Sequence, residues 1–272
     1  MNPRAVLLTG NGRRHRYVAV RLAEGLGLSG VLSEAKPMNS PGSVPETEED
    51  RRVIECHFSG RDAAEDALLG RDVEFPEGVP LREVPIGGSN FLETLQWIGT
   101  LKVDVVLLYG TSIIKSRLLR AFGMRVLNMH LGLSPYYRGS GTNFWPLVDR
   151  RPECVGVTIH LATSEVDGGP ILAQVRPSIE SGDRSHEIGT RSILSGLRAL
   201  MSVVPAYLEG RLLPVPQSPF KNPAYRRRDF SASSVRRMEH HFATGMIEEY
   251  LSDKTTRDLR YPIVDPPGVR QC

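Results

Sequence analysis

The feature that most constrains the fold of this chain is an apolar run at residues 103–109, Val-Asp-Val-Val-Leu-Leu-Tyr, which Gly110 closes. A run this short and apolar is typical of a strand that is buried on both faces. Further short apolar runs lie at 4–9, 28–33 and 81–85, and helix-compatible sequence separates them. Because parallel neighbours need long crossover connections, this alternation predicts a parallel α/β sheet.

The pattern changes after residue 150. Two extended stretches, 155–161 and 170–177, are separated by only a short turn sequence, which predicts that adjacent strands pair and that the sheet is mixed. A long amphipathic helix is expected over 185–208, and Pro205 should bend or end it.

After Gly210 the sequence becomes rich in Pro and Arg, and one more amphipathic helix is expected near 234–251. We therefore predict an α/β, Rossmann-like domain over 1–208, with a mostly parallel mixed sheet flanked by helices. Residues 209–272 should form a small C-terminal helical appendage. Its amphipathic helix offers a surface through which a homodimer could form.

Composition narrows the class of protein. The net charge of +3 is too mild to indicate a nucleic-acid surface, and no stretch approaches the ~18 apolar residues of a membrane span. The start of the chain has too short an apolar segment for a secretory signal, and three widely spaced cysteines do not suggest a disulfide framework. We expect a soluble, cytoplasmic protein with no membrane partner. The histidines and cysteines show no spacing typical of a metal site.

The candidate site begins where the apolar residues 125–127 lead into Asn128 and His130, followed by a loop rich in Gly, Ser and Pro. Side chains two apart in a strand point the same way, so these two polar groups should project side by side. We expect them at a strand terminus, where open α/β sheets place their ligand crevice. The neighbouring Ser140 does not fit a nucleophile elbow, so a covalent serine mechanism is not indicated.

Four motifs in order resemble the signature of the folate-dependent formyltransferase family. They are Asn128-x-His130, the Pro-Tyr-Tyr-Arg-Gly sequence at 135–139, the Gly-Val-Thr-Ile sequence at 156–159, and Asp167-x-Gly169-x-Ile171. The resemblance covers roughly residues 80–180. It implies an enzyme that transfers a formyl group from N10-formyltetrahydrofolate to a primary amine.

The resemblance assigns the chemistry to Asn128, His130 and Asp167. Negative charge develops on the formyl oxygen during the transfer, and Asn128 and a protonated His130 can donate hydrogen bonds to it. Such donors are worth ~3 kcal/mol each in other acyl transfers. Asp167 can orient the imidazole and accept the proton of the amine directly or through water.

The resemblance also implies binding residues. It places the folate along the backbone after the 103–109 run and against the loop before Asp167, at Thr111, Ser112, Ile113, Lys115, Glu165 and Val166. Candidates for the acceptor are Gly10, Asn11, Gly12, Arg13, Tyr137 and Arg138. The first four could equally form only a tight strand-to-helix turn, and Tyr137 could equally pack the loop.

Departures from the family's patterns point to the acceptor. The first turn continues as Arg13-Arg14-His15-Arg16, where glycinamide ribonucleotide transformylase carries a Ser-Asn phosphate grip. The stretch after residue 210 is short for the RNA-binding barrel of the methionyl-tRNA enzymes. By elimination we expect a small amine metabolite, such as a nucleotide-linked amino sugar. The alternatives are a formyltetrahydrofolate hydrolase, a folate- or nucleotide-binding module without turnover, and an RNA-directed enzyme that uses the Arg-rich tail.

Overall fold

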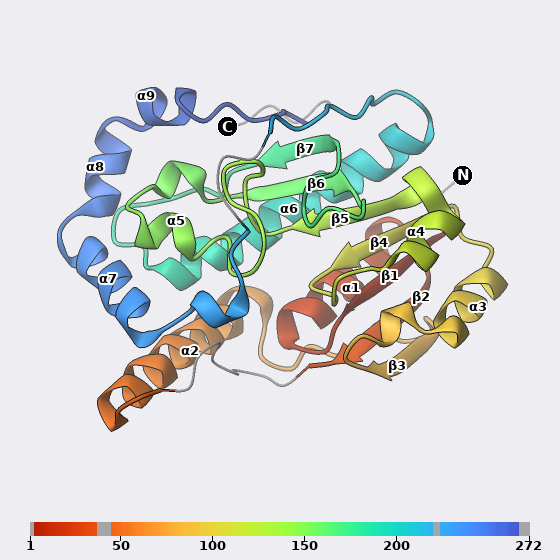
Figure 1. Cartoon of the computed structure of the whole chain (residues 1–272), viewed down its shortest axis with the longest axis horizontal. Helices are drawn as coiled ribbons and strands as arrows, with labels where there is room; N and C mark the ends of the chain where they lie inside the picture. The colour runs from red at the N-terminus through yellow and green to blue at the C-terminus, as the bar shows by residue number, and fades with distance from the viewer. Residues whose placement is uncertain (1–2, 37–44, 220–223, 267–272) are drawn as a thin grey trace.

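The computed structural model describes residues 3–36, 45–219 and 224–266 (Figure 1). Its sheet has the order β3-β2-β1-β4-β5-β6-β7, in which the first five strands along the chain run parallel and the last two are antiparallel to their neighbours. The strands are β1 (Ala5–Gly10), β2 (Leu28–Ala35), β3 (Leu81–Pro85), β4 (Val105–Tyr109), β5 (Val126–His130), β6 (Val157–Leu161) and β7 (Ile171–Val175). The predicted mixed α/β sheet is confirmed, including the pairing of the two adjacent strands after residue 150.

Helices connect and cover these strands. They are α1 (Arg13–Gly25), α2 (Glu48–Leu69), α3 (Leu92–Thr100), α4 (Ser116–Phe122), α5 (Trp145–Val148), α6 (Ser185–Leu208), α7 (Ala232–Ala243), α8 (Met246–Ser252) and α9 (Lys254–Leu259). Among the helices of the described residues, none combines the length and the apolar composition that crossing a bilayer requires.

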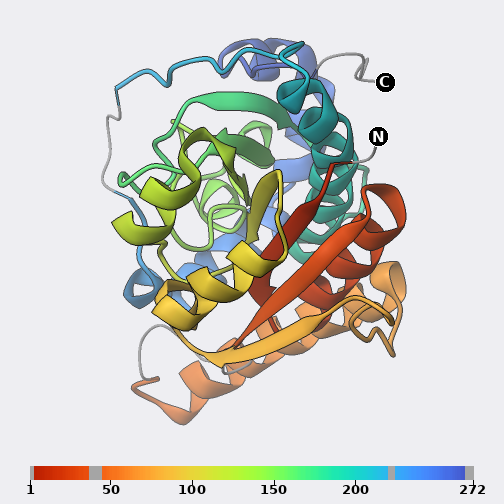
Figure 2. The ribbon, with the colours of Figure 1, turned by 90° about the vertical axis from the view of Figure 1, so that its right-hand side faces the viewer.

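The two faces of the sheet are covered by different helices (Figure 2). Alternate residues of β1 point to opposite sides, so Leu7 packs with α1 and α6 while Leu8 packs with Ile98 of α3 and Leu118 of α4. Both leucines of β1 are fully buried. Burial of a leucine side chain stabilises the fold by about 1.5–3 kcal/mol, so β1 anchors the sheet from both sides.

A third apolar cluster lies beside the sheet and joins the C-terminal helices to the segment after β5. Met238 of α7 and Tyr250 of α8 pack there with Tyr137, Trp145 and Val155. The predicted boundary at residue 208 coincides with the end of α6 and stays a prediction as a domain boundary.

One expectation about the helices is wrong. The single helix expected near 234–251 is divided, because Gly245 adopts a left-handed conformation (φ 77°) between α7 and α8. Helix α6 covers Ser185–Leu208 as predicted, and Pro205 lies inside it without ending it. Cys56 and Cys154 are free thiols, and Cys272 lies outside the described residues.

Candidate active site

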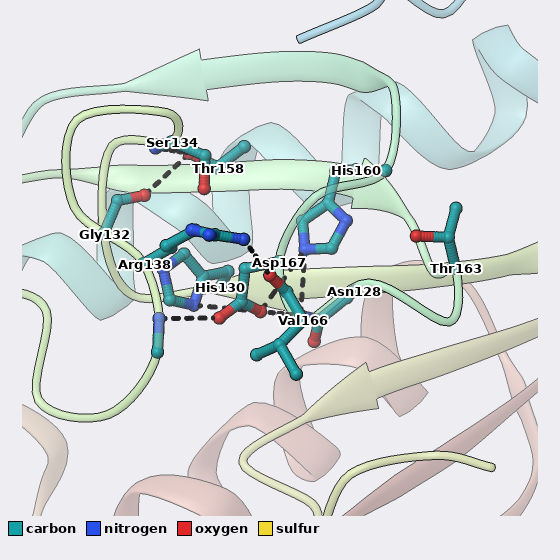
Figure 3. A network of polar contacts seen from close by, with 12 residues as sticks. Asn128, His130, Gly132, Ser134, Arg138, Thr158, His160, Thr163, Val166 and Asp167 are labelled. Carbon is teal, nitrogen blue, oxygen red and sulfur yellow. Dashed lines mark hydrogen bonds and ion pairs between the residues drawn. The ribbon is translucent and has the colours of Figure 1, made fainter. Parts of the chain in front are cut away.

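The site is built on the pairing of β5 with β6. Asn128 and His130 lie at the C-terminal end of β5, of which His130 is the last residue, as the sequence predicted. The antiparallel register places Asn128 opposite His160 and His130 opposite Thr158. Directly opposed residues share one face of the sheet, so the Nδ2 of Asn128 lies 3.0 Å from the Nε2 of His160 (Figure 3).

Asp167 reaches this pair from the loop between β6 and β7. Its Oδ1 lies 3.4 Å from the Nδ1 of His130 and accepts a hydrogen bond of 3.3 Å from the Nδ2 of Asn128. Its Oδ2 accepts a 2.9 Å hydrogen bond from the backbone N–H of Gly139. The structure therefore brings the three sequence-predicted residues into one network, and their catalytic role stays a prediction.

The surroundings of Asp167 keep its carboxyl group ionised. Burial alone would raise its pKa, but His130, His160 and the N–H of Gly139 together outweigh burial and hold the pKa well below its usual range. A carboxylate that accepts several hydrogen bonds from such neighbours is stabilised in its charged form. The site thus contains a fixed negative charge beside two imidazoles.

His130 is nearly buried, with 7% of its surface exposed. Burial lowers its pKa, while the Asp167 carboxylate acts in the opposite direction. Its Nε2 lies 3.2 Å from the hydroxyl of Thr142 and 3.4 Å from the carbonyl oxygen of Tyr137. The lowered pKa favours a neutral imidazole at rest, contrary to the protonated donor that the sequence suggested, and a neutral imidazole can accept a proton.

Comparison with known proteins identifies the family. The model of the formyl transferase family matches residues 91–204, which contain all three residues of the network. The match spans less than half of the chain, and it assigns this segment to the formyl transferase family. The resemblance that these motifs indicated is thereby confirmed, and the matched segment is that of a formyltransferase family enzyme.

Individual relatives agree with this assignment. The phosphoribosylglycinamide formyltransferase of Haemophilus influenzae is 29% identical over 164 residues, which cover 58% of this chain and 76% of that protein. The glycinamide ribonucleotide transformylase 1 of Symbiobacterium toebii has the same fold, with a TM-score of 0.55 and 19% identity over 79% of this chain and 94% of that one. A sugar N-formyltransferase from Shewanella sp FDAARGOS_354 also has this fold, with a TM-score of 0.52. Its sequence identity is 18% over 83% of this chain and 78% of that one. The chain spans 54% or less of the methionyl-tRNA formyltransferases that it matches.

Two members of this network were not identified from the sequence. His160 and Thr142 contact Asn128 and His130 respectively, but neither belongs to a motif with a recognisable spacing. The alternation of β6 indicated only that His160 lies on one face of a strand. Its position beside Asn128, a residue 32 positions earlier in the chain, depends on the register between two strands, which no local pattern encodes.

The loop predicted to bind folate is fixed by hydrogen bonds to two side chains that the sequence did not indicate. Glu34, fully buried at the end of β2, accepts hydrogen bonds of 2.8 and 2.7 Å from the backbone N–H and hydroxyl of Ser112. Asn90 donates to the carbonyl of Ile113 at 3.0 Å and accepts from the N–H of Lys115 at 2.7 Å. These bonds shape the loop, and its contact with folate stays a prediction.

The second part of the predicted folate site touches a predicted acceptor residue. The Nη1 of Arg138 lies 3.2 Å from the Oε1 of Glu165 and 3.4 Å from the carbonyl of Val166. Arg138 therefore links the loop after β5 to the loop that carries Asp167. Tyr137 is buried, and its hydroxyl donates to Asp149 at 2.9 Å, so its side chain packs the loop.

The turn between β1 and α1 is closely packed. The glycines at 10 and 12 lie against the ring of His15, because a Cβ on Gly10 would come within 3.1 Å of it and one on Gly12 within 3.3 Å. Arg13 pairs with Asp66 of α2, and the side-chain oxygen of Asn11 accepts from a backbone N–H at 3.2 Å. The structure supports the turn interpretation, and an acceptor contact there stays a prediction. Among the described residues, no group of three metal-ligating side chains comes together.

Proposed function

We propose that this protein transfers a formyl group from N10-formyltetrahydrofolate to a primary amine of a small metabolite. The observation that carries the proposal is the network of Asn128, His130 and Asp167, whose polar atoms lie 3.3–3.4 Å apart at the face of β5. A half-buried amide, a neutral imidazole and an ionised carboxylate are the groups that transfer to an amine requires.

The cosubstrate supplies an electrophilic formyl carbon, and the side chains supply the rest. Asn128 donates to the formyl oxygen as charge develops there, which requires it to exchange one of its present bonds to His160 or Asp167. The neutral His130 accepts the proton that the attacking amine loses and returns it to N10 as the C–N10 bond breaks. Asp167 stabilises the imidazolium that forms between these two steps.

The loop after β4 suits a flat heterocycle with a polar edge. Ile113 is 68% exposed, and Phe91, next to the Asn90 that binds the carbonyl of Ile113, is 47% exposed. An apolar surface beside fixed backbone polar groups is the usual composition of a small-molecule site. We therefore retain Thr111, Ser112, Ile113 and Lys115 as folate contacts within the proposal.

For the acceptor we propose a small amine metabolite, with a nucleotide-linked amino sugar as the class to test first. Arg13 and Arg14 at the first turn are paired with Asp66 and Glu65 of α2, so a phosphate would have to compete with two carboxylates there. The described part of the tail folds into helices that pack on the core, which favours a small acceptor over tRNA. A cytoplasmic location and a homodimer remain parts of the same proposal.

A mass-spectrometric screen tests this proposal. The purified protein is incubated with N10-formyltetrahydrofolate and a panel of amines that includes nucleotide-linked amino sugars, and a formyl gain is expected on one class. Asp167→Asn serves as the inactive control. Release of formate at the full rate without any amine would identify a hydrolase instead, and no turnover with intact cofactor binding would identify a binding module.

A further inference from the structure

The segment that follows α6 runs back over the outer edge of the sheet (Figure 2). We call residues 211–219 the strap. Val215 of the strap pairs with Ile171 at the start of β7 through two backbone hydrogen bonds of 2.7 Å each. The strap is therefore fixed next to the loop that ends at Ile171, which is the loop that carries Asp167.

Gln217 of the strap holds this loop directly. Its side-chain amide donates to the backbone carbonyl of Asp167 at 2.9 Å and to that of Gly169 at 2.6 Å. An amide nitrogen has two hydrogens, so both can be used at once. The reversed amide would turn its oxygen toward two carbonyl oxygens, and the orientation is thereby determined.

The loop needs such support because its backbone is unusual. Asp167 has a φ of 52°, a left-handed conformation that residues other than glycine rarely adopt. A Cβ at Gly169 would lie 1.8 Å from the carbonyl oxygen of Leu161, so the loop must pass very close to β6. The backbone conformation of Asp167 sets the direction of its carboxylate toward His130.

A second tail residue supports the other side of the same carboxylate. Tyr225 pairs by backbone hydrogen bonds with the carbonyl of Arg138 at 3.0 Å and the N–H of Ser140 at 2.8 Å. Gly139 lies between these two, and its N–H donates to the Oδ2 of Asp167. The ring of Tyr225 stacks on Trp145 with a centroid distance of 4.6 Å, which anchors this contact.

We propose that the tail completes the active site and that Gln217 is a positioning residue, which sets the Asp167 carboxylate against His130 from outside the segment that the family model matches. The proposal rests on the proposed function for its kinetic consequence. The geometric part of the proposal is independent of the proposed function, because it can be measured without substrate.

The test compares Gln217→Met and Gln217→Glu with the wild type. Methionine has similar volume but no donor, and glutamate turns two oxygens toward the loop carbonyls. We expect kcat to fall about 10- to 100-fold, as loss of alignment does in other enzymes, while KM for the cosubstrate stays within about twofold. Ser218→Ala, at an exposed position of the same strap, is the matched control and should leave both constants unchanged.

A second measurement separates positioning from mere folding. Histidine NMR reports the pKa of His130, which should fall further in Gln217→Met because the Asp167 carboxylate that raises it has moved away. His160 also lies 3.7 Å from the Oδ1 of Asp167, so His240 of α7 serves as the internal reference instead. An unchanged pKa of His130 in a folded Gln217→Met protein, or an unchanged kcat, would overturn the proposal. Since the NMR measurement needs no amine, failure to find an acceptor would leave it interpretable.

Discussion

Asp167→Asn is the substitution that tests the site most directly, because it removes a charge while the side chain keeps its size. The carboxylate lies 3.4 Å from the Nδ1 of His130. With an effective dielectric constant of about 20, two unit charges at that separation interact by about 5 kcal/mol. That energy is available only once His130 has taken the proton of the amine, so it acts in the transition state.

At about 1.4 kcal/mol per factor of ten, this energy corresponds to a loss of roughly 10³- to 10⁴-fold in kcat. The asparagine amide would also face the Nδ2 of Asn128, a donor that now binds the Oδ1 of Asp167. The two effects have the same sign. KM for the cosubstrate should change much less, because its predicted contacts lie mainly in the loop at 111–115.

The assay is single-turnover formyl transfer with the best acceptor from the screen, followed by rapid quench and mass spectrometry. Asp72→Asn is the matched control, since this substitution removes the same charge at an exposed position. Thermal unfolding of both variants shows that the fold is retained. A folded Asp167→Asn enzyme with kcat within tenfold of the wild type would refute the electrostatic argument and the role given to Asp167.

Three further predictions concern pH, backbone and loop. Burial lowers the pKa of His57 to about 4 and of His186 to about 3. Below pH 6.5 these two histidines are therefore protonated in the unfolded chain but not in the folded one, and the folded state loses stability as the pH falls. Urea denaturation should show a loss of about 2–4 kcal/mol for the pair between pH 7 and pH 5, and a flat profile would contradict this. Gly139→Ala should destabilise the protein by more than about 2 kcal/mol, because its φ is 99° and a Cβ would lie 2.1 Å from the carbonyl oxygen of Tyr225. In the control variant Gly99→Ala, in α3, the added Cβ meets no atom within 4 Å, so this change should stabilise the protein by about 0.5–1 kcal/mol. If calorimetry gave the same change in stability for Gly139→Ala and Gly99→Ala, the steric argument would be wrong. Glu34→Gln should raise KM for the cosubstrate several-fold with little effect on kcat, because it loosens Ser112, and a selective loss of kcat would place Glu34 elsewhere in the mechanism.

Local sequence determined the elements of this protein and the direction of its first two site residues. Helix α6 occupies 185–208 as its apolar spacing predicted, since helical periodicity is encoded by neighbours three and four residues apart. Asn128 and His130 share a face because a strand repeats every two residues. The division between α7 and α8 was missed, although Gly245 was a visible signal for it.

Tertiary structure alone decided which groups meet. His160 lies beside Asn128 because of the register of β5 with β6, and Glu34 reaches Ser112 from a strand 78 residues away. Gln217 contacts the Asp167 loop because the chain returns along β7 after a helix of 24 residues. Such contacts depend on strand order and on the path of connections, which are set by the burial of whole elements rather than by any local pattern. The sequence therefore predicted Asn128, His130 and Asp167 as candidates, and the fold supplied the groups that hold them in place.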